Sequence, residues 1–192
     1  MKFYYNKIEL EAPENVYYPR EDSLLMANAL EKLDLKGKKV LETGCGSGFL
    51  SILTAKNGAD VISVDINEEA VGITKINAES NNVTLSVLES DLFSNVKGKF
   101  DFIIFNPPYL PVESGENDKT YVGGKTGRDT IEKFVSKVKS YLKPDGTVLI
   151  LISSLTNEEK VIDLFEMQKM KTTVVAREKI PWEELIVIKA TL

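Results

Sequence analysis

Histidine is absent from this chain of 192 residues, and Cys45 is its single cysteine. Without histidine, the chain cannot form a Ser-His-Asp triad, a histidine general base or a histidine-ligated metal site. One cysteine cannot form an internal disulfide or a CxxC zinc site. We therefore expect no metal site in this chain and a chemistry that works without a histidine base.

Long apolar runs and an excess of basic residues are also missing. No run approaches the roughly 20 apolar residues of a membrane span, and the first residues lack the apolar core of a signal peptide. The net charge is −5 and the isoelectric point is near 5.0, whereas proteins that grip nucleic acid through phosphates are normally basic. We expect a cytoplasmic protein that acts on a protein or small molecule, although a local basic patch stays possible.

The length and the 43% hydrophobic content are sufficient for one compact domain with a buried core. The chain contains no internal repeat or low-complexity linker, so residues 1–192 are predicted to form a single domain. Within it, residues 1–36 are expected to be an N-terminal extension. Residues 3–8 and 14–18 are predicted to pair as a hairpin, and a helix over 24–33 is expected to be capped by Asp22 or Ser23.

Beyond residue 36, apolar strand patterns alternate with helical patterns. The predicted strands are 39–43, 60–65, 84–88, 100–105 and 147–152, and the predicted helices are 49–57, 67–79, 128–142 and 157–169. Two further strands, 172–178 and 185–190, follow each other without a helix between them. The alternation predicts a Rossmann-like, doubly wound α/β fold with a mostly parallel seven-stranded sheet. The final pair predicts one antiparallel strand at the far edge.

A glycine-rich turn, Glu42-Thr43-Gly44-Cys45-Gly46-Ser47-Gly48, follows the first core strand and opens a helix. Glycines at Gly44 and Gly46 allow a tight turn and let a ligand approach bare backbone at a helix N-terminus. The spacing is GxGxG, which differs from the GxGxxG of dinucleotide-binding proteins. The turn therefore predicts a ligand site that is distinct from the usual nicotinamide site.

Acidic side chains lie at the ends of three successive strands: Glu42 near the end of the first, Asp65 at the end of the second and Asp91 after the third. The carboxyl ends of parallel strands meet at one edge of the sheet, where open α/β sheets bind ligands. Asp65 is placed to accept hydrogen bonds from ribose hydroxyls. Glu42 would repel a pyrophosphate and suits an ammonium or sulfonium group. The inferred cofactor is S-adenosylmethionine.

The fourth strand leads into Asn106-Pro107-Pro108-Tyr109. The Asn106 side-chain carbonyl and the Pro107 backbone carbonyl can accept hydrogen bonds from a planar NH2 group, and the Tyr109 ring can lie against it. Such a nitrogen is a weak nucleophile, so orientation beside the methyl donor supplies much of the catalysis. The segment predicts methyl transfer to an amide or to the exocyclic amine of a base.

Together these segments resemble the HemK-like release-factor glutamine methyltransferases, in the single-domain type of archaea and eukaryotes, which are class I S-adenosylmethionine-dependent enzymes. The segments are Tyr18 to Ser23, the turn Glu42 to Gly48, the tetrad Asn106 to Tyr109, and Gly123-Gly124-Lys125-Thr126-Gly127-Arg128. Amino-methyltransferases of DNA and RNA share the tetrad alone. The first and last segments therefore carry the narrower resemblance.

The resemblance implies roles for residues and for partners. It places Ser23, Glu42, Gly44, Gly46, Asp65, Asp91, Leu92 and Asn106 around the cofactor, and Asn106, Pro107, Pro108 and Tyr109 around the substrate. The implied substrate is the glutamine of the Gly-Gly-Gln motif in a class 1 translation termination factor. The implied partner is a small zinc-binding activator protein, which completes the sheet edge in a heterodimer. A membrane or nucleic-acid partner is not implied.

Three other functions stay open at this point. An amino-methyltransferase acting on a base in RNA or DNA would use the tetrad equally well, but it needs a base-flipping surface and phosphate contacts. A non-catalytic adenosyl-binding module would keep the cofactor pocket without turnover. A nicotinamide-dependent oxidoreductase fits Glu42 and the glycine spacing poorly. We expect Cys45, within the glycine turn, and Trp182, near the last two strands, to be packing residues, with Trp182 against the sheet edge.

Overall fold

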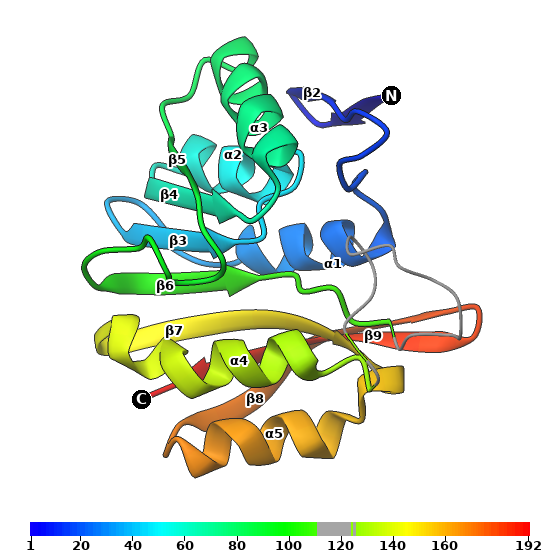
Figure 1. Cartoon of the computed structure of the whole chain (residues 1–192), viewed down its shortest axis with the longest axis vertical. Coiled ribbons are helices and arrows are strands. Elements are labelled where there is room, and N and C mark those ends of the chain that lie inside the picture. The colour runs from blue at the N-terminus through cyan, green and yellow to red at the C-terminus, as the bar shows by residue number, and fades with distance from the viewer. Residues whose placement is uncertain (111–123, 125) are drawn as a thin grey trace.

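The computed structural model describes residues 1–110, 124 and 126–192, and its centre is a seven-stranded sheet (Figure 1). The order of the strands across the sheet is β5-β4-β3-β6-β7-β9-β8. The strands are β3 (Lys39–Thr43), β4 (Asp60–Asp65), β5 (Ser86–Glu89), β6 (Phe100–Phe105), β7 (Leu142–Ser153), β8 (Lys171–Ile180) and β9 (Glu183–Thr191). The predicted mostly parallel α/β sheet is confirmed.

The position of the antiparallel strand differs from the prediction. β3 to β7 run parallel, whereas β9 runs antiparallel to both of its neighbours, β7 and β8. β9 therefore lies one place in from the edge, and β8 forms the edge. The reason is burial, because the run Leu185 to Ile188 is buried on both faces whereas β8 alternates between exposed and half-buried residues.

Helices cover both faces of the sheet (Figure 1). They are α1 (Glu21–Leu30), α2 (Phe49–Lys56), α3 (Glu68–Ser80), α4 (Asp129–Val138) and α5 (Glu158–Met167). Alternate residues of β7 enter two separate cores: Leu149 packs with residues of α1 and α2, and Ile150 packs with residues of α4 and α5. Along the described part of the chain, no helix is long and apolar enough to cross a membrane.

The N-terminal hairpin forms from segments other than the predicted pair. β1 (Lys2–Tyr5) pairs with β2 (Ile8–Glu11), and residues 14–18 are not a strand. A two-residue turn that begins at Asn6 joins the two strands. Asn6 takes a positive φ of 50°, a conformation that asparagine tolerates. Asn77 of α3 and Asn81, the residue that caps its C-terminal end, hydrogen-bond to the backbone of β2 and hold the hairpin against the domain.

Several element ends also shift. α1 begins at Glu21 rather than at residue 24, and Arg20 is its N-cap without a side-chain bond, so Asp22 and Ser23 lie in the first turn and do not cap it. The predicted helix 128–142 is α4 followed by a 3-10 turn, η1 (Lys139–Tyr141), and a second 3-10 turn, η2 (Ser154–Thr156), follows β7. These shifts leave the order of elements unchanged.

Trp182 does not pack against the sheet edge as predicted. It lies in the turn between β8 and β9, and its side chain is 97% exposed. Cys45, in contrast, is buried beside Val71 and Val87, with its sulfur 3.4 Å from the Thr74 hydroxyl. The packing prediction for Trp182 is therefore wrong, whereas the packing prediction for Cys45 is consistent with the structure.

Candidate active site

A cleft of about 620 Å³ opens at the carboxyl ends of β3, β4 and β6. The chain returns from β5 to the other side of β3 to form β6, which makes this the switch point where open α/β sheets bind ligands. All the residues predicted for the cofactor and the substrate line this one cleft. They are Ser23, Glu42, Gly44, Gly46, Asp65, Asp91, Leu92, Asn106, Pro107, Pro108 and Tyr109.

The glycine turn exposes backbone to the cleft. Gly44 and Gly46 take positive φ values of 71° and 53°, which side-chain-bearing residues rarely adopt. The N–H groups of Gly44 and Cys45 both donate to the Val64 carbonyl, at 2.8 and 3.0 Å. The turn is thus fixed to the end of β4, and its two glycines offer bare backbone for a ligand to approach.

The Asp65 carboxylate is fixed by backbone donors. Its Oδ2 accepts from the Gly46 N–H and its Oδ1 from the Asn67 N–H, both at 2.9 Å. Burial raises the pKa of Asp65 despite these two bonds, which act in the opposite direction. Each oxygen keeps a second lone pair, so the carboxylate can also accept from a pair of ligand hydroxyls.

Glu42 lies at the base of the cleft and is buried. Its Oε2 accepts from the Ser51 hydroxyl, and the Ser51 and Ser63 hydroxyl oxygens are 2.5 Å apart. Burial raises the pKa of Glu42 to about 8, and the nearby Asp65 charge acts in the same direction. The carboxyl is therefore mostly neutral at pH 7 in the free protein, and a cation in the cleft would favour its ionised form.

For S-adenosylmethionine, the cofactor expected from the sequence, this shift predicts a pH-dependent affinity. Between pH 6 and 7.5 we expect the affinity to rise with pH, by up to roughly tenfold per unit, because binding must release the Glu42 proton. Calorimetric titration at pH 7 in buffers of different ionisation enthalpy measures the released proton. Release should disappear in Glu42→Gln, and equal heats in all buffers for the unmodified protein would contradict the expectation.

The raised pKa of Glu42 has the opposite effect on the stability of the ligand-free protein, which falls as pH rises. Because the folded chain holds the Glu42 proton up to about pH 8 and an unfolded carboxyl loses it near 4.5, stability falls as pH rises between these values. The Glu42→Gln variant should lack this contribution. Thermal unfolding of both proteins without ligand at pH 5.5 and 7.5 provides the control for the binding experiment.

The Asn106 side chain is oriented by Asp22. Its Nδ2 donates to Asp22 Oδ2 at 2.8 Å, and the Tyr17 hydroxyl donates to the same oxygen at 2.6 Å. A carboxylate can only accept, so the amide nitrogen must face Asp22. Among the described residues Asn106 Oδ1 is left buried without a hydrogen-bond partner. A buried acceptor of this kind costs about 1–3 kcal/mol, and it is suited to an N–H donor from outside the chain.

Asp22 and Tyr17 are positioning residues that sequence reasoning missed. The sequence suggested Asp22 as a helix cap, but its side chain is buried and directed to Asn106. The available signal was its place in the Tyr18 to Ser23 segment that carries the resemblance. Spacing alone could not have revealed the contact, because Asp22 and Asn106 are 84 positions apart in the chain.

Tyr109 contributes a neutral ring. Burial raises its pKa well above the usual value, and the charges of Asp22, Glu183 and Glu21 act in the same direction. The phenol therefore keeps its proton at any physiological pH. Tyr109 can pack against a planar group in the cleft, but it cannot serve as a general base there.

Gly127 supports the backbone of Tyr109. It takes a positive φ of 70°, and a Cβ built on it would lie 2.3 Å from the Tyr109 carbonyl oxygen. The next residue, Arg128, donates to the Thr156 carbonyl at 2.7 Å. The described part of the Gly-Gly-x-x-Gly-Arg stretch thus packs on the Asn106 to Tyr109 segment at Tyr109, while Gly123 and Lys125 lie outside the described residues.

Gly127→Ala should therefore damage turnover. The added methyl group must displace the Tyr109 backbone, and we expect kcat to fall by about 10- to 100-fold with little change in cofactor affinity, since misplacement of about 1 Å can cost 10²-fold. Gly72→Ala is the matched control, because nothing lies within 4 Å of its Cβ position on α3. Equal kcat values for the two variants would contradict the assigned contact.

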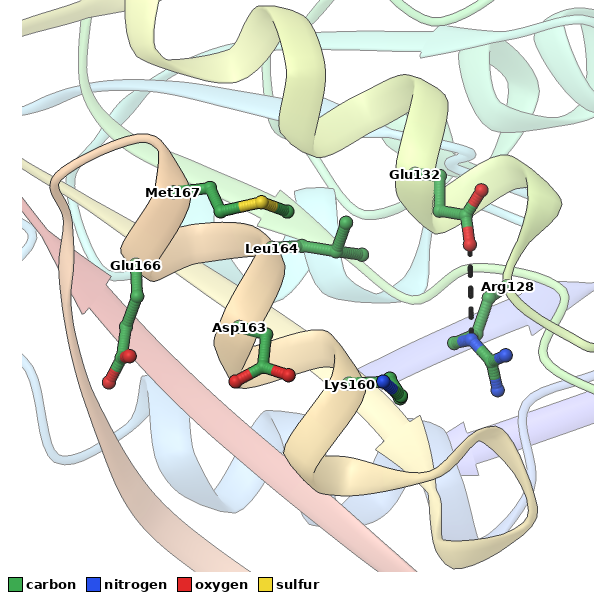
Figure 2. Close-up of a pocket in the computed structure, with 7 residues that line it drawn as sticks. All are labelled: Arg128, Glu132, Lys160, Asp163, Leu164, Glu166 and Met167. Carbon is green, nitrogen blue, oxygen red and sulfur yellow. Dashed lines mark ion pairs between the residues drawn. The ribbon is translucent and has the colours of Figure 1, made fainter.

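A second groove, of about 580 Å³, lies between α4 and α5 (Figure 2). Its lining includes the Arg128–Glu132 pair, whose closest atoms are 3.9 Å apart, together with Lys160, Asp163 and Met167. None of the predicted site residues lines it. Within the described residues, no three acidic or cysteine side chains converge as a metal site, here or elsewhere. The cleft at the strand ends is therefore the candidate active site.

The sheet has one antiparallel strand, β9, inserted between β7 and β8, and its cleft lies at the carboxyl ends of β3, β4 and β6. Together these two features define a class I methyltransferase fold. The Mtq2–Trm112 complex of E. cuniculi, described as responsible for methylation of the eRF1 translation termination factor, contains a similar chain. The TM-score is 0.77 at 25% identity, and the match covers 92% of this chain and 98% of that one.

Sequence comparison gives the family. The Methyltransferase small domain family matches residues 21–180. A Methanocaldococcus jannaschii protein that carries the provisional name protein N5-glutamine methyltransferase is 47% identical over 189 residues, covering 95% of both chains. The human methyltransferase HEMK2 is 31% identical over 195 residues, covering 92% of this chain and 90% of HEMK2. The chain belongs to the methyltransferase small domain family, among its HemK-like members.

Proposed function

We propose that this methyltransferase modifies the side-chain amide nitrogen of the glutamine in the Gly-Gly-Gln motif of a class 1 translation termination factor. The observation that carries the proposal is the buried Asn106 Oδ1, which is fixed by Asp22 and has no partner among the described residues. A primary amide supplies the N–H that this oxygen needs. The HemK-like resemblance, and the eRF1 methylation described for the E. cuniculi complex, support this substrate.

We infer that the cleft holds S-adenosylmethionine, the cofactor that the class I methyltransferase family implies. When bound, it supplies an electrophilic methyl group on a sulfonium centre. The buried Glu42 carboxyl, the bare backbone of Gly44 and Gly46 and the Asp65 carboxylate fit its ammonium, its amino-acid portion and its ribose. Ser23, Asp91, Leu92 and Asn106 would complete the pocket.

The chain's own contribution to the chemistry is orientation. Asn106 Oδ1 and the Pro107 carbonyl would accept the two amide N–H groups, while the Tyr109 ring packs against the amide plane. Two accepted hydrogen bonds hold the nitrogen so that its lone pair can face the methyl group. The amide proton becomes acidic once the nitrogen carries positive charge, so the site works without a histidine or a tyrosinate base.

We further propose that a small partner protein binds this chain on the β5 side of the sheet; the similar Mtq2 chain is in a complex with a second protein, Trm112. β5 is an edge strand, and beside it Ile66 and Leu88 are 67% and 42% exposed. The opposite edge strand, β8, carries Lys171, Arg177 and other charges that protect an edge against pairing. A partner strand at β5 would cover the two apolar side chains. That the partner binds zinc rests on the family resemblance alone.

The test of the proposed function is transfer of labelled methyl from S-adenosylmethionine. The acceptors are a class 1 termination factor, the same factor with its Gly-Gly-Gln glutamine replaced, and mixed RNA and DNA, each with and without the small partner. We expect label on the intact factor alone. Label on nucleic acid alone would favour the other function that the tetrad permits, methylation of a base amine.

A further inference from the structure

The turn between β8 and β9 presents an aromatic side chain to solvent. Trp182 is 97% exposed, more than any other large hydrophobic residue that the structure describes. Exposed single hydrophobic residues are common, but a fully exposed tryptophan indole is a large apolar surface with no packing role in this chain. Neither the core nor the sheet edge therefore explains the presence of this residue.

The backbone does not explain it either. Ile180 pairs with Glu183, so Pro181 and Trp182 form a two-residue turn. Trp182 takes a positive φ of 77°. Proline in the second position and a positive φ in the third are typical of a type II turn, in which glycine is preferred at the third position. Tryptophan is strained where glycine would be relaxed, and outliers of this kind are commonest at functional sites.

The turn is held firmly in place. The Glu184 N–H donates to the Ser154 hydroxyl at 3.0 Å. Arg177 donates to both Glu158 and Glu184, at 2.6 and 2.9 Å, and so ties the hairpin to the start of α5. These contacts support a rigid hairpin end that extends past β7, whose last pairing with β9 is at Ser153.

The same turn lies beside the active site. β9 is antiparallel to β7, so it begins at the end of the sheet where the parallel strands finish, and Figure 1 shows the turn projecting beyond the sheet at the end to which β6 points. Ile180 packs in the same core as Tyr109. Glu183 is close enough for its charge to act on Tyr109, and its buried Oε2 has no hydrogen-bond partner among the described residues.

We propose that Trp182 and Glu183 form a docking site for the protein substrate, next to the place where its acceptor side chain enters the cleft. The indole packs against the surface of that protein, and the Glu183 side chain, whose Oε2 is buried in the free protein without a partner among the described residues, turns to accept an N–H from its backbone or from a basic side chain. This inference rests on the proposed function. The chemistry favours a protein over nucleic acid, because among the described residues the carboxylates of Asp22, Glu21 and Glu183 near Tyr109 outnumber the one cation there, Arg20, and would repel phosphates.

The test uses Trp182→Gly, which removes the indole while giving the turn the residue that its backbone prefers. With the intact termination factor we expect KM to rise at least about tenfold, kcat and the cofactor Kd to stay within about twofold, and the unfolding temperature to stay equal or rise. A short Gly-Gly-Gln peptide, which bears only the acceptor segment, should show the same kcat/KM with both proteins. Met167→Ala, an exposed apolar residue in the other groove, is the matched control.

Direct titration of the factor separates this inference from the proposed function. If the unmodified protein fails to methylate the factor, the proposed function fails, while a lower factor affinity of Trp182→Gly would still identify the turn as a binding surface. An unchanged KM and factor affinity would overturn the docking site. Loss of small-partner binding or of self-association in Trp182→Gly, with factor affinity unchanged, would overturn it as well.

Discussion

Replacing Asn106 by alanine is expected to lower kcat for methyl transfer by about 10²- to 10³-fold, the loss typical when one oriented hydrogen-bonding group is removed from an active site. The Asn106 oxygen is buried, fixed through Asp22 and available to a donor from outside the chain. The cofactor Kd should change by less than about fivefold, since the cofactor has other contacts in the cleft. Single-turnover transfer and calorimetric titration measure the two quantities separately.

The control for Asn106→Ala is Asn95→Ala. Asn95 is also an asparagine whose Nδ2 donates to an oxygen, here the Glu89 carbonyl at 2.8 Å, but it does not line the cleft. Its replacement should leave kcat within about twofold. If thermal unfolding showed that Asn106→Ala had lost its folded structure, the asparagine would be part of a structural turn. If Asn106→Ala folded and kept full activity, the catalytic role would be refuted.

Replacing Asp65 by alanine is expected to raise the cofactor Kd by about 10²-fold or more. Hydrogen bonds to a charged group are worth about 1.5–3 kcal/mol each, and the carboxylate is placed to accept two ribose hydroxyls. Its loss also releases the Gly46 N–H from its acceptor. A contact made equally in the ground and transition states changes KM for the cofactor and leaves kcat at saturation unchanged.

Asp60→Ala is the matched control for Asp65→Ala, because Asp60 is an exposed aspartate at the opposite end of the same strand. Both variants are compared by titration with S-adenosylmethionine and by kcat at saturating cofactor. A normal Kd in Asp65→Ala would show that the ribose lies elsewhere. A lower kcat at saturation, with Kd unchanged, would move Asp65 from cofactor binding to the chemistry of transfer.

Much of the site could be predicted because parallel α/β folds convert sequence position into spatial position. Once the strands were recognised, Glu42, Asp65 and Asn106 each lay at or directly after the carboxyl end of a strand, and such ends meet at one edge of the sheet. The predicted residues therefore line one cleft although they are spread over the chain. The β8–β9 pair was also recognised, but its order in the sheet was not, because both orders satisfy the same local pattern.

Other features depended on contacts between distant segments. The sequence showed a possible acceptor in Asn106, but only the fold brought Asp22 to orient it. A glycine at position 127 was visible, but its approach to the Tyr109 carbonyl was not. Glu42 was expected to be an anion, whereas its burial in the finished core raises its pKa and favours the protonated form.

The sequence by itself determined the class of the fold, the edge of the sheet that binds ligands and the residue types that meet there. These depend on local patterns, such as the periodicity of apolar residues, glycine turns and the residues that follow each strand. Tertiary structure alone decided the insertion of β9, the orientation of Asn106, the exposure of Trp182 and the protonation of Glu42. Each of these is set by the burial and neighbours that a side chain acquires from distant parts of the chain, which no local pattern encodes.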